Sequence, residues 1–183
     1  MKYCPKCRTR YPEADGLCPR DQSPLEPDPL LGWTVARRRL DGVLGEGAQA
    51  VVYRATHVDL HRAEVVKILK QRSGNLSPER FAREARALAS MSTEHVVQVH
   101  DYGQTADGEH FLVMELVSGD SLREVLQREG PLELARALRI VEQLCLGLAE
   151  AHRLGIIHRD LKPDNVLLER RKGATERVKI VDF

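Results

Sequence analysis

Short runs of apolar and β-branched residues alternate with polar turns along the chain after residue 36, a pattern typical of strands. Residues 166–168 and 178–181 have the same character and predict a small hairpin around residues 171–173. A turn through Asp107-Gly108 separates the apolar runs at 96–99 and 111–116. The earlier runs predict strands at 39–44, 50–56, 63–69, 96–99 and 111–116.

Helical spacing of apolar residues appears after residue 77. Ser77 and Pro78 suit the N-cap and first position of a helix, and Phe81, Ala85 and Leu88 then recur on one face. A short helix is predicted at 121–128. A longer helix at 132–153 is predicted to place one apolar stripe against a core, formed by Leu134, Leu138, Val141, Leu144, Leu148 and Ala151.

The composition changes twice along the chain. Residues 1–22 are rich in Cys, Pro and charge and have no periodicity. Residues 23–35 contain three prolines, at positions 24, 27 and 29, and predict a stiff, extended linker with little to bury. Residues 36–183 contain the strand and helix patterns. The chain is therefore predicted to be an α+β protein, with a small N-terminal segment, a linker and one main domain.

Charge and hydropathy exclude several classes of function. Lys and Arg number 28 against 27 Asp and Glu, so no basic excess favours nucleic acid or an anionic membrane. No apolar run approaches the length of a membrane span, and the N-terminal MKYCPKCRTR is not a signal peptide. We therefore expect a cytoplasmic protein with no nucleic-acid partner and with no membrane segment within residues 1–183; a membrane span beyond residue 183 stays open.

A glycine-rich turn lies between the first two predicted strands. Its residues are Leu44, Gly45, Glu46, Gly47 and Ala48. Glycines let a backbone approach phosphate groups closely and leave N–H groups free to point at them. The same pattern is compatible with an ordinary hairpin turn, so this motif by itself indicates phosphate binding only weakly.

Two charged residues follow the glycine-rich turn. Lys67 lies in the third predicted strand, where an ammonium group can pair with phosphates, and Glu84 on the next helix can pair with Lys67. The alternatives are a solvated lysine and a surface glutamate that pairs with Arg80, at i and i+4.

Residues 158–165, with the sequence HRDLKPDN, form the most specific motif. A carboxylate at Asp160 can accept or orient the proton of an attacking hydroxyl, and an ammonium at Lys162 can neutralise a transferred phosphate. The amide oxygen of Asn165 and the carboxylate of Asp182 are hard ligands that suit Mg²⁺. The motif resembles the catalytic-loop pattern of protein kinases. The alternative is a charged loop after a helix, which eight residues that match this pattern in order make improbable.

The order of these motifs resembles that of the bacterial Ser/Thr protein kinases of the eukaryotic-like type. The resemblance covers about residues 38–183 and implies a two-lobe fold. It would have a complete N-terminal lobe, with a five-stranded sheet and one helix, and a partial helical C-terminal lobe. It also implies ATP and Mg²⁺ as cofactors and a protein substrate with Ser or Thr.

The resemblance assigns further residues. Met114, Glu115 and Val117 would form the gatekeeper and hinge at the adenine edge, and the adenine ring would lie between Val52, Val65 and Leu167. A stack of side chains would align the lobes, formed by Leu88, Val99, His158 and Phe183. Ala50 replaces the third glycine of the usual loop pattern, so we expect weaker nucleotide binding.

The sequence stops at Val181-Asp182-Phe183, before the glycine that would complete Asp-Phe-Gly. We therefore expect these 183 residues by themselves to be an inactive fragment of a kinase. The alternatives are a non-catalytic nucleotide-binding module and an interaction module centred on the N-terminal cysteines.

Three of the four cysteines lie within the first eighteen residues, which indicates metal binding before disulfide formation. Cys4 and Cys7 form a C-x₂-C turn, and Cys18 and Asp21 repeat its spacing. The segment resembles the zinc-ribbon fragments that precede some bacterial kinases, which implies a Zn²⁺ site. Asp21 could ligate the metal or only cap its turn, and a disordered tail with free thiols is the alternative. Cys145 is expected to be a small core residue.

Overall fold

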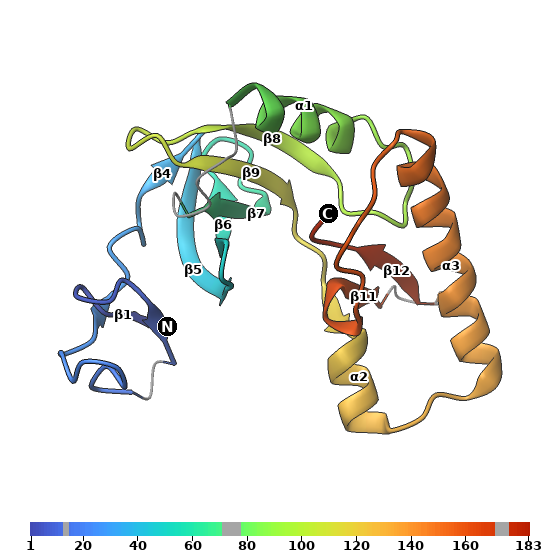
Figure 1. The fold of residues 1–183 in the computed structure, drawn as a ribbon, viewed down its shortest axis with the longest axis horizontal. Coiled ribbons are helices and arrows are strands. Elements are labelled where there is room, and N and C mark those ends of the chain that lie inside the picture. The colour runs from blue at the N-terminus through green and yellow to red at the C-terminus, as the bar shows by residue number, and fades with distance from the viewer. Residues whose placement is uncertain (13–14, 71–77, 171–175) are drawn as a thin grey trace. The chain divides into compact units, whose positions relative to one another are not determined.

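The computed structural model describes residues 1–12, 15–70, 78–170 and 176–183 and contains two compact units (Figure 1). Unit 1 comprises Met1–Leu76 and Tyr102–Met114, and unit 2 comprises Ser77–Asp101 and Glu115–Phe183. The predicted N-cap at Ser77 and the predicted turn at 171–173 lie outside the described residues.

Unit 1 is built on a six-stranded sheet with the order β4-β5-β6-β7-β9-β8 (Figure 1). The bounds of the predicted strands are confirmed to within two residues, with one exception. The prediction of a strand at 96–99 was wrong, because the strand in this region begins at Val99. The sheet also has one strand more than predicted, because residues 34–35 of the supposed linker add an edge. The strands are β4 (Thr34–Val35), β5 (Arg38–Glu46), β6 (Ala50–His57), β7 (Ala63–Leu69), β8 (Val99–Gln104) and β9 (His110–Glu115).

Alternation along the strands gives this sheet two different faces. One face packs into a buried cluster that includes Tyr53, Val66 and Val113, none of which is exposed to solvent. Val52 and Lys67 are neighbours of these residues in sequence and therefore belong to the opposite face. That opposite face is the one on which the predicted nucleotide-binding side chains of unit 1 lie.

The described residues of the N-terminal segment, 1–12 and 15–22, are folded and contribute to a second sheet. β1 (Lys2–Tyr3), β2 (Arg10–Tyr11) and β3 (Glu26–Pro27) pair in the order β2-β1-β3. Cys4, Cys18 and Leu25 form its buried centre. This small core favours a folded segment over the alternative of a disordered tail.

The expectation of a linker with little to bury at residues 23–35 was wrong. Asp28 is buried, and Leu30 and Leu31 pack against the core of the main sheet. The prolines of this segment carried no information about these buried contacts. The N-terminal segment is therefore joined to the main sheet by packed residues.

Unit 2 combines helices with a three-stranded sheet in the order β10-β11-β12. Its predicted helices are confirmed to within two residues. Within the described residues no helix is long and apolar enough to cross a membrane. The elements are α1 (Pro78–Ala89), β10 (Gly119–Ser121), α2 (Leu122–Glu129), α3 (Leu134–Arg153), the 3₁₀ turn η1 (Pro163–Asn165), β11 (Val166–Glu169) and β12 (Arg177–Ile180).

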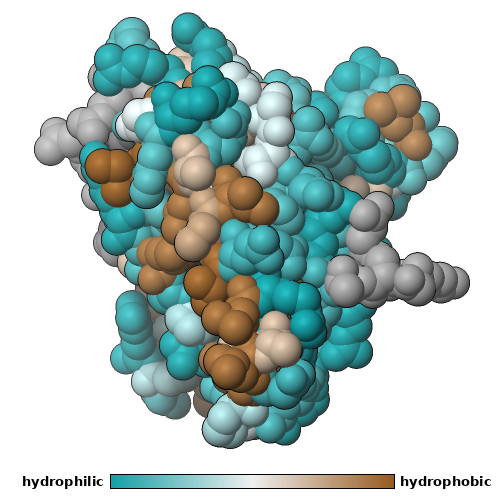
Figure 2. Space-filling view, turned by 90° about the vertical axis from the view of Figure 1, so that its right-hand side faces the viewer, coloured by the Kyte–Doolittle hydropathy of each residue, from teal (hydrophilic) through white to brown (hydrophobic). Residues whose placement is uncertain are grey.

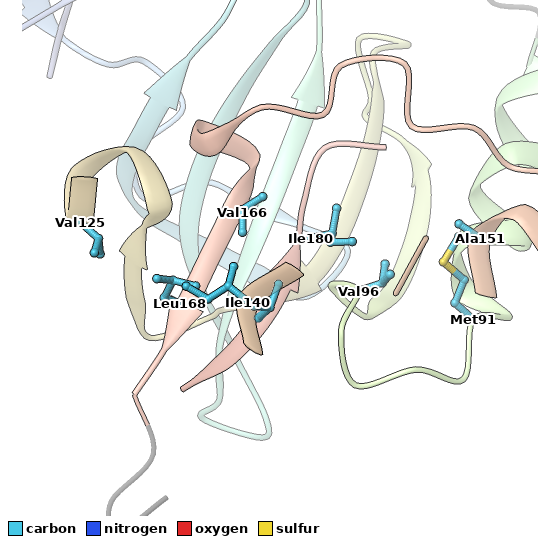
Figure 3. Close-up of a cluster of buried hydrophobic side chains, with 9 residues drawn as sticks. Met91, Val96, Val125, Ile140, Ala151, Val166, Leu168 and Ile180 are labelled. Carbon is cyan, nitrogen blue, oxygen red and sulfur yellow. The ribbon is translucent and has the colours of Figure 1, made fainter. Parts of the chain in front are cut away.

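The core of unit 2 lies between its helices and its sheet (Figure 3). Ile140 and Ala151 of α3 join Val166, Leu168 and Ile180 of the sheet in this cluster. Gly147 is needed for the close approach of α3 to β12, because a Cβ atom there would lie 2.9 Å from Cδ1 of Ile180. Burial of this cluster places β11 and β12, and with them the loops that precede and follow them.

The apolar stripe predicted on α3 is divided between two faces of the helix. Leu144, Leu148 and Ala151 contact the core as predicted. The expectation for Leu134, Leu138 and Val141 was wrong: they are 73%, 59% and 53% exposed. Figure 2 looks onto the side that carries α3 and shows a band of apolar side chains on this surface. Cys145, expected in the core, is also exposed.

Candidate functional site

The HRDLKPDN loop follows α3 and precedes β11 in unit 2. Its backbone takes an unfavourable conformation at Arg159, where φ is +64°, and Asp182 after β12 has a φ of +63°. Such left-handed conformations are uncommon for residues with a side chain, and they concentrate at functional sites. Two strained positions in the predicted catalytic motifs are consistent with a functional role for both.

Asp160, Lys162 and Asn165 are brought together by this loop. Nζ of Lys162 lies 2.7 Å from Oδ2 of Asp160, and Nδ2 of Asn165 donates to the backbone oxygen of Asp160 at 2.9 Å. The hydrogen bond from Lys162 holds the pKa of the exposed Asp160 below its ordinary value, and Asp160 in turn raises the pKa of Lys162. The loop therefore presents an ionised carboxylate beside an ammonium group.

His158 joins the loop to the strand end that carries Asp182. Its Nε2 lies 2.8 Å from the backbone oxygen of Val181, and its Nδ1 accepts the backbone N–H of Asp160 at 3.3 Å. Its ring lies 4.6 Å from that of Phe183, as the predicted stack requires of this pair. These contacts define an imidazole protonated on Nε2. The side chain of His158 therefore connects the backbone next to Asp182 with the backbone of Asp160.

Two ion pairs of unit 2 were not predicted. Arg123 of α2 lies 3.2 Å from Asp164 of the loop, and the buried Lys179 of β12 pairs with Glu115. Glu115 also accepts the backbone N–H of Gln98 at 2.8 Å. The predicted hinge residue Glu115 is therefore fixed through its side chain, a role that periodicity alone does not reveal.

The glycine-rich turn forms a tight hairpin between β5 and β6 in unit 1. The N–H of Gly47 donates to the backbone oxygen of Ala50 at 2.9 Å. Gly45 pairs with Val52, and Val52 pairs with Lys67, so these three residues form a row across three strands. Leu44 and Ala48 are exposed. The predicted phosphate loop and the predicted lysine are thus neighbours on one sheet.

The remaining predicted nucleotide contacts of unit 1 share the face of Lys67. Val65 lies two residues from Lys67 on β7, and Met114 lies one residue beyond the core residue Val113 on β9. Several predicted partners belong to unit 2 instead, so the pairing with Lys67 and the adenine contacts that join the two sets stay predictions. Those residues are Glu84, Glu115, Val117 and Leu167.

The two cysteine turns of the N-terminal segment have the same backbone hydrogen bonds. Cys4 N–H donates to Thr9 and Arg8 N–H donates to Cys4, at 3.0 and 2.8 Å. Cys18 bonds with Ser23 and Gln22 in the same way, at 2.8 and 2.9 Å. Arg8 and Gln22, the equivalent turn ends, have φ of +56° and +59°. Cys7 and Asp21 are therefore equivalent positions in a repeated turn.

The side chains of these turns converge. One ligand atom from each of Cys4, Cys7, Cys18 and Asp21 lies within 4.8 Å of all the others. Tetrahedral zinc with Zn–S bonds of about 2.3 Å separates its sulfurs by about 3.8 Å, so only a small contraction is needed. The geometry fits a four-ligand metal site.

The acidity of these groups differs within the cluster. Burial raises the pKa of the Cys4 thiol to about 11, whereas a hydrogen bond from the Tyr11 hydroxyl lowers the pKa of Cys7 to about 6. Hydrogen bonds from Ser23 lower the pKa of Asp21 to about 2. Cys7 and Asp21 are thus suited to be anionic near neutral pH, and a bound cation would stabilise the thiolate of Cys4.

Residues 39–183 match the protein kinase domain family. The chain is 39% identical over 159 residues to the serine/threonine-protein kinase pkn3 of Myxococcus xanthus, covering 85% of this chain and 29% of that protein. It is 40% identical over 163 residues to PknA of Mycobacterium tuberculosis, covering 85% and 37%. The chain therefore spans less than two-fifths of the length of these curated relatives.

Solved structures show the same likeness. The PknI kinase domain of Mycobacterium tuberculosis has a TM-score of 0.70 and 29% identity, with 84% of this chain and 62% of that chain covered. Rad53, solved in complex with AMP-PNP, has a TM-score of 0.71 and 30% identity, with 80% and 38% covered. Both likenesses extend over most of the 183 residues.

Proposed function

Because the chain belongs to the protein kinase family, we propose that it serves phosphoryl transfer from ATP to serine and threonine hydroxyl groups of proteins. The observation that carries this proposal is the arrangement of Asp160, Lys162 and Asn165 on one short loop, with His158 joining it to the strand end at Asp182. A cytoplasmic location, where ATP is abundant and thiols are reduced, suits this activity and the free cysteines.

Asp160 orients the substrate hydroxyl in this proposal. It accepts the proton as that oxygen bonds to the γ-phosphorus, while the bond from phosphorus to ADP breaks and ADP keeps the electron pair. Lys162 lies close enough to Asp160 to place its charge beside the transferred group. The pair thus combines proton acceptance with charge stabilisation.

The residues present fit Mg²⁺ as well as ATP. The amide nitrogen of Asn165 is the atom that donates to Asp160, so its amide oxygen is the atom suited to a cation. Asp182 has an exposed carboxylate close to the loop. Bound Mg²⁺ would neutralise phosphate charge, and these two residues would supply hard oxygen ligands for it. In unit 1, the glycine-rich hairpin and Lys67 would hold the phosphates, consistent with the AMP-PNP bound by the similar Rad53.

The test is transfer of labelled γ-phosphate to a generic Ser/Thr substrate by a kinase domain that continues past Phe183. We expect phosphoserine and phosphothreonine, no phosphotyrosine, and loss of transfer with EDTA. Mg-ATP binding without any transfer would contradict the proposal and support the non-catalytic nucleotide-binding alternative.

A zinc site is the second function proposed, because the repeated turns bring three sulfurs and one carboxylate within ligand reach. Zinc would replace a large apolar core as the main stabilising contact of the N-terminal segment. The segment then serves as an interaction module only while the metal holds its two turns together.

Metal analysis of the purified 183-residue chain tests this site. We expect about one zinc per chain, retained near neutral pH, and a loss of most of it in Cys4→Ser. Cys145→Ser is the matched control, since that cysteine is exposed and far from the cluster in sequence. Asp21→Cys should bind zinc more tightly. Absence of zinc from the purified chain, with freely titratable thiols at positions 4, 7 and 18, would refute the site.

A further inference from the structure

A buried group of charges in unit 1 surrounds Arg10. Its guanidinium pairs with Asp28 and donates to the hydroxyl of Tyr53 at 2.7 Å. It also lies over the rings of Tyr3 and Tyr53, at 5.3 and 5.6 Å. The side chains of Arg10 and Asp28 are only 7% and 0% exposed. A cation that is buried and paired in this way is part of the packed interior of the fold and not a solvated surface charge.

The same group reaches the glycine-rich hairpin. The backbone N–H of Arg10 donates to Oε2 of Glu46 at 2.8 Å, and the guanidinium lies 3.8 Å from that oxygen. Lys70 pairs with the other oxygen of Glu46 and donates to the backbone oxygen of Gly47 at 2.9 Å. The side chain of Glu46, which lies between the two glycines of the loop, is therefore held from both sides.

Arginine suits this position because its planar group has five N–H donors in a fixed fork. Asp28 and Tyr53 use these donors at the same time, so the guanidinium connects β2 with residue 28 and with β6. The backbone N–H of Arg10 donates to Glu46 in the same arrangement. Lysine has the charge but lacks the fork, so it cannot satisfy both partners in one geometry.

The cysteine turns support the strand on which Arg10 lies. β2 has only two residues, Arg10 and Tyr11, and a strand this short is not stable by itself. Arg10 follows the metal-site residue Cys7 by three positions, and the hydroxyl of Tyr11 lies 3.4 and 3.5 Å from the sulfurs of Cys7 and Cys18. The sulfur cluster and the arginine are thus held by one short hairpin.

We infer that Arg10 is a positioning residue for nucleotide binding, through which the N-terminal segment holds the glycine-rich hairpin in its phosphate-binding arrangement. The inference rests on the proposed kinase function, since it gives that loop the phosphates as its ligand. Arg10 does not touch the nucleotide. It raises the fraction of molecules whose loop is ordered, and apparent affinity is proportional to that fraction.

The experiment compares Arg10→Lys, Arg10→Met and the double variant Arg10→Met/Asp28→Asn, which leaves no buried carboxylate at position 28 unpaired. Arg20→Met is the matched control, because Arg20 is an exposed arginine of the same segment. Amide hydrogen exchange is measured for a peptide over residues 44–50 and for a reference peptide over residues 63–69. The dissociation constant of Mg-AMP-PNP is measured on the same preparations.

We expect about tenfold faster exchange at residues 44–50 in both methionine variants, with unchanged exchange at 63–69 and about tenfold weaker Mg-AMP-PNP binding. Arg10→Lys should be intermediate and Arg20→Met should equal the wild type. Unchanged exchange at residues 44–50, or an equal rise in both peptides, would overturn the inference. So would faster loop exchange with unchanged nucleotide affinity.

Failure of the proposed function gives a different result. A wild-type chain that binds no Mg-AMP-PNP under any condition would contradict nucleotide binding, and with it the role of the loop. Hydrogen exchange would still show whether Arg10 holds the hairpin. Removal of metal with a chelator should reproduce the faster exchange at residues 44–50 if the cysteine site supports β2.

Discussion

The HRDLKPDN loop of unit 2 and the N-terminal segment of unit 1 both hold charged groups in place, but they do so in opposite ways. In the loop, Asp160 is exposed and its partners Lys162 and Asn165 lie two and five positions away. In the segment, Arg10 is buried and its partners Asp28, Glu46 and Tyr53 lie 18, 36 and 43 positions away. Exposed local pairs leave reactive groups accessible to a substrate, whereas buried distant pairs fix one part of the chain against another.

The largest expected effect concerns the residues proposed to contact the phosphates and the metal. Lys67→Ala and Asp182→Ala should each lower phosphotransfer by about 10³-fold or more, because one removes a phosphate contact and the other a metal ligand. The measurement is autophosphorylation of a kinase domain that continues past Phe183. Arg39→Ala on β5 is the control, since its side chain is 60% exposed. Near wild-type activity of Lys67→Ala would contradict the assignment.

Helix α3 has the same contrast between a buried and an exposed side chain, at positions 140 and 138. Ile140 is 3% exposed and Leu138 is 59% exposed. Ile140→Ala should lower the free energy of unfolding by about 2–4 kcal/mol, because it leaves a cavity in the core of unit 2. Leu138→Ala should change it by less than about 0.5 kcal/mol. Chemical denaturation measures both, and equal effects would contradict the division of the stripe.

The exposed half of α3 predicts the behaviour of a polypeptide of residues 1–183. Leu134, Leu138 and Val141 form an apolar surface that favours association, and we expect this polypeptide to be catalytically silent and to self-associate. The double variant Leu134→Glu/Leu138→Glu should shift it towards monomer in analytical ultracentrifugation, whereas Arg139→Glu should not. A monomeric wild type with ordinary kinase turnover would show the prediction to be wrong.

The smallest expected effect is electrostatic. Lys162 holds the pKa of Asp160 below its ordinary value, so Lys162→Met should raise the pKa of Asp160 towards that value. Since the folded-state pKa is the lower one, the pair adds stability above the ordinary pKa of aspartate and loses it as the pH falls through the depressed pKa. A carboxyl NMR titration measures the shift. An unchanged pKa of Asp160 in Lys162→Met would show that Lys162 is not the main cause of its lowered pKa.

Local pattern predicted most of the fold. The strands β5, β6 and β7 and the helices followed from periodicity, and the groups of the HRDLKPDN loop met as expected because the loop is short. The contacts among Asp160, Lys162 and Asn165 could be expected because they join residues close in sequence. Lys67 lay in its predicted strand for the same reason.

The contacts that sequence reasoning missed are all long-range. Arg10 appeared as one more charge in a polar segment, and the residues that bury it come from the supposed linker and from β6. Lys179 was likewise hidden in a short apolar run, although it pairs with Glu115 across 64 positions. A single amphipathic pattern also could not separate the buried Ile140 face of α3 from the exposed Leu138 face. Tertiary packing decided each case.

The most direct test of this account compares Arg10→Lys with Asp160→Asn in steady-state kinetics of a kinase domain that continues past Phe183. Arg10→Lys should raise the KM for ATP several-fold, by less than about tenfold, with an unchanged kcat, because it affects only the order of the glycine-rich hairpin. Asp160→Asn should lower kcat by about 10²–10⁴-fold with an unchanged KM, because it removes the proton acceptor. A lower kcat with unchanged KM in Arg10→Lys, or a wild-type kcat in Asp160→Asn, would contradict the division of roles between the two regions.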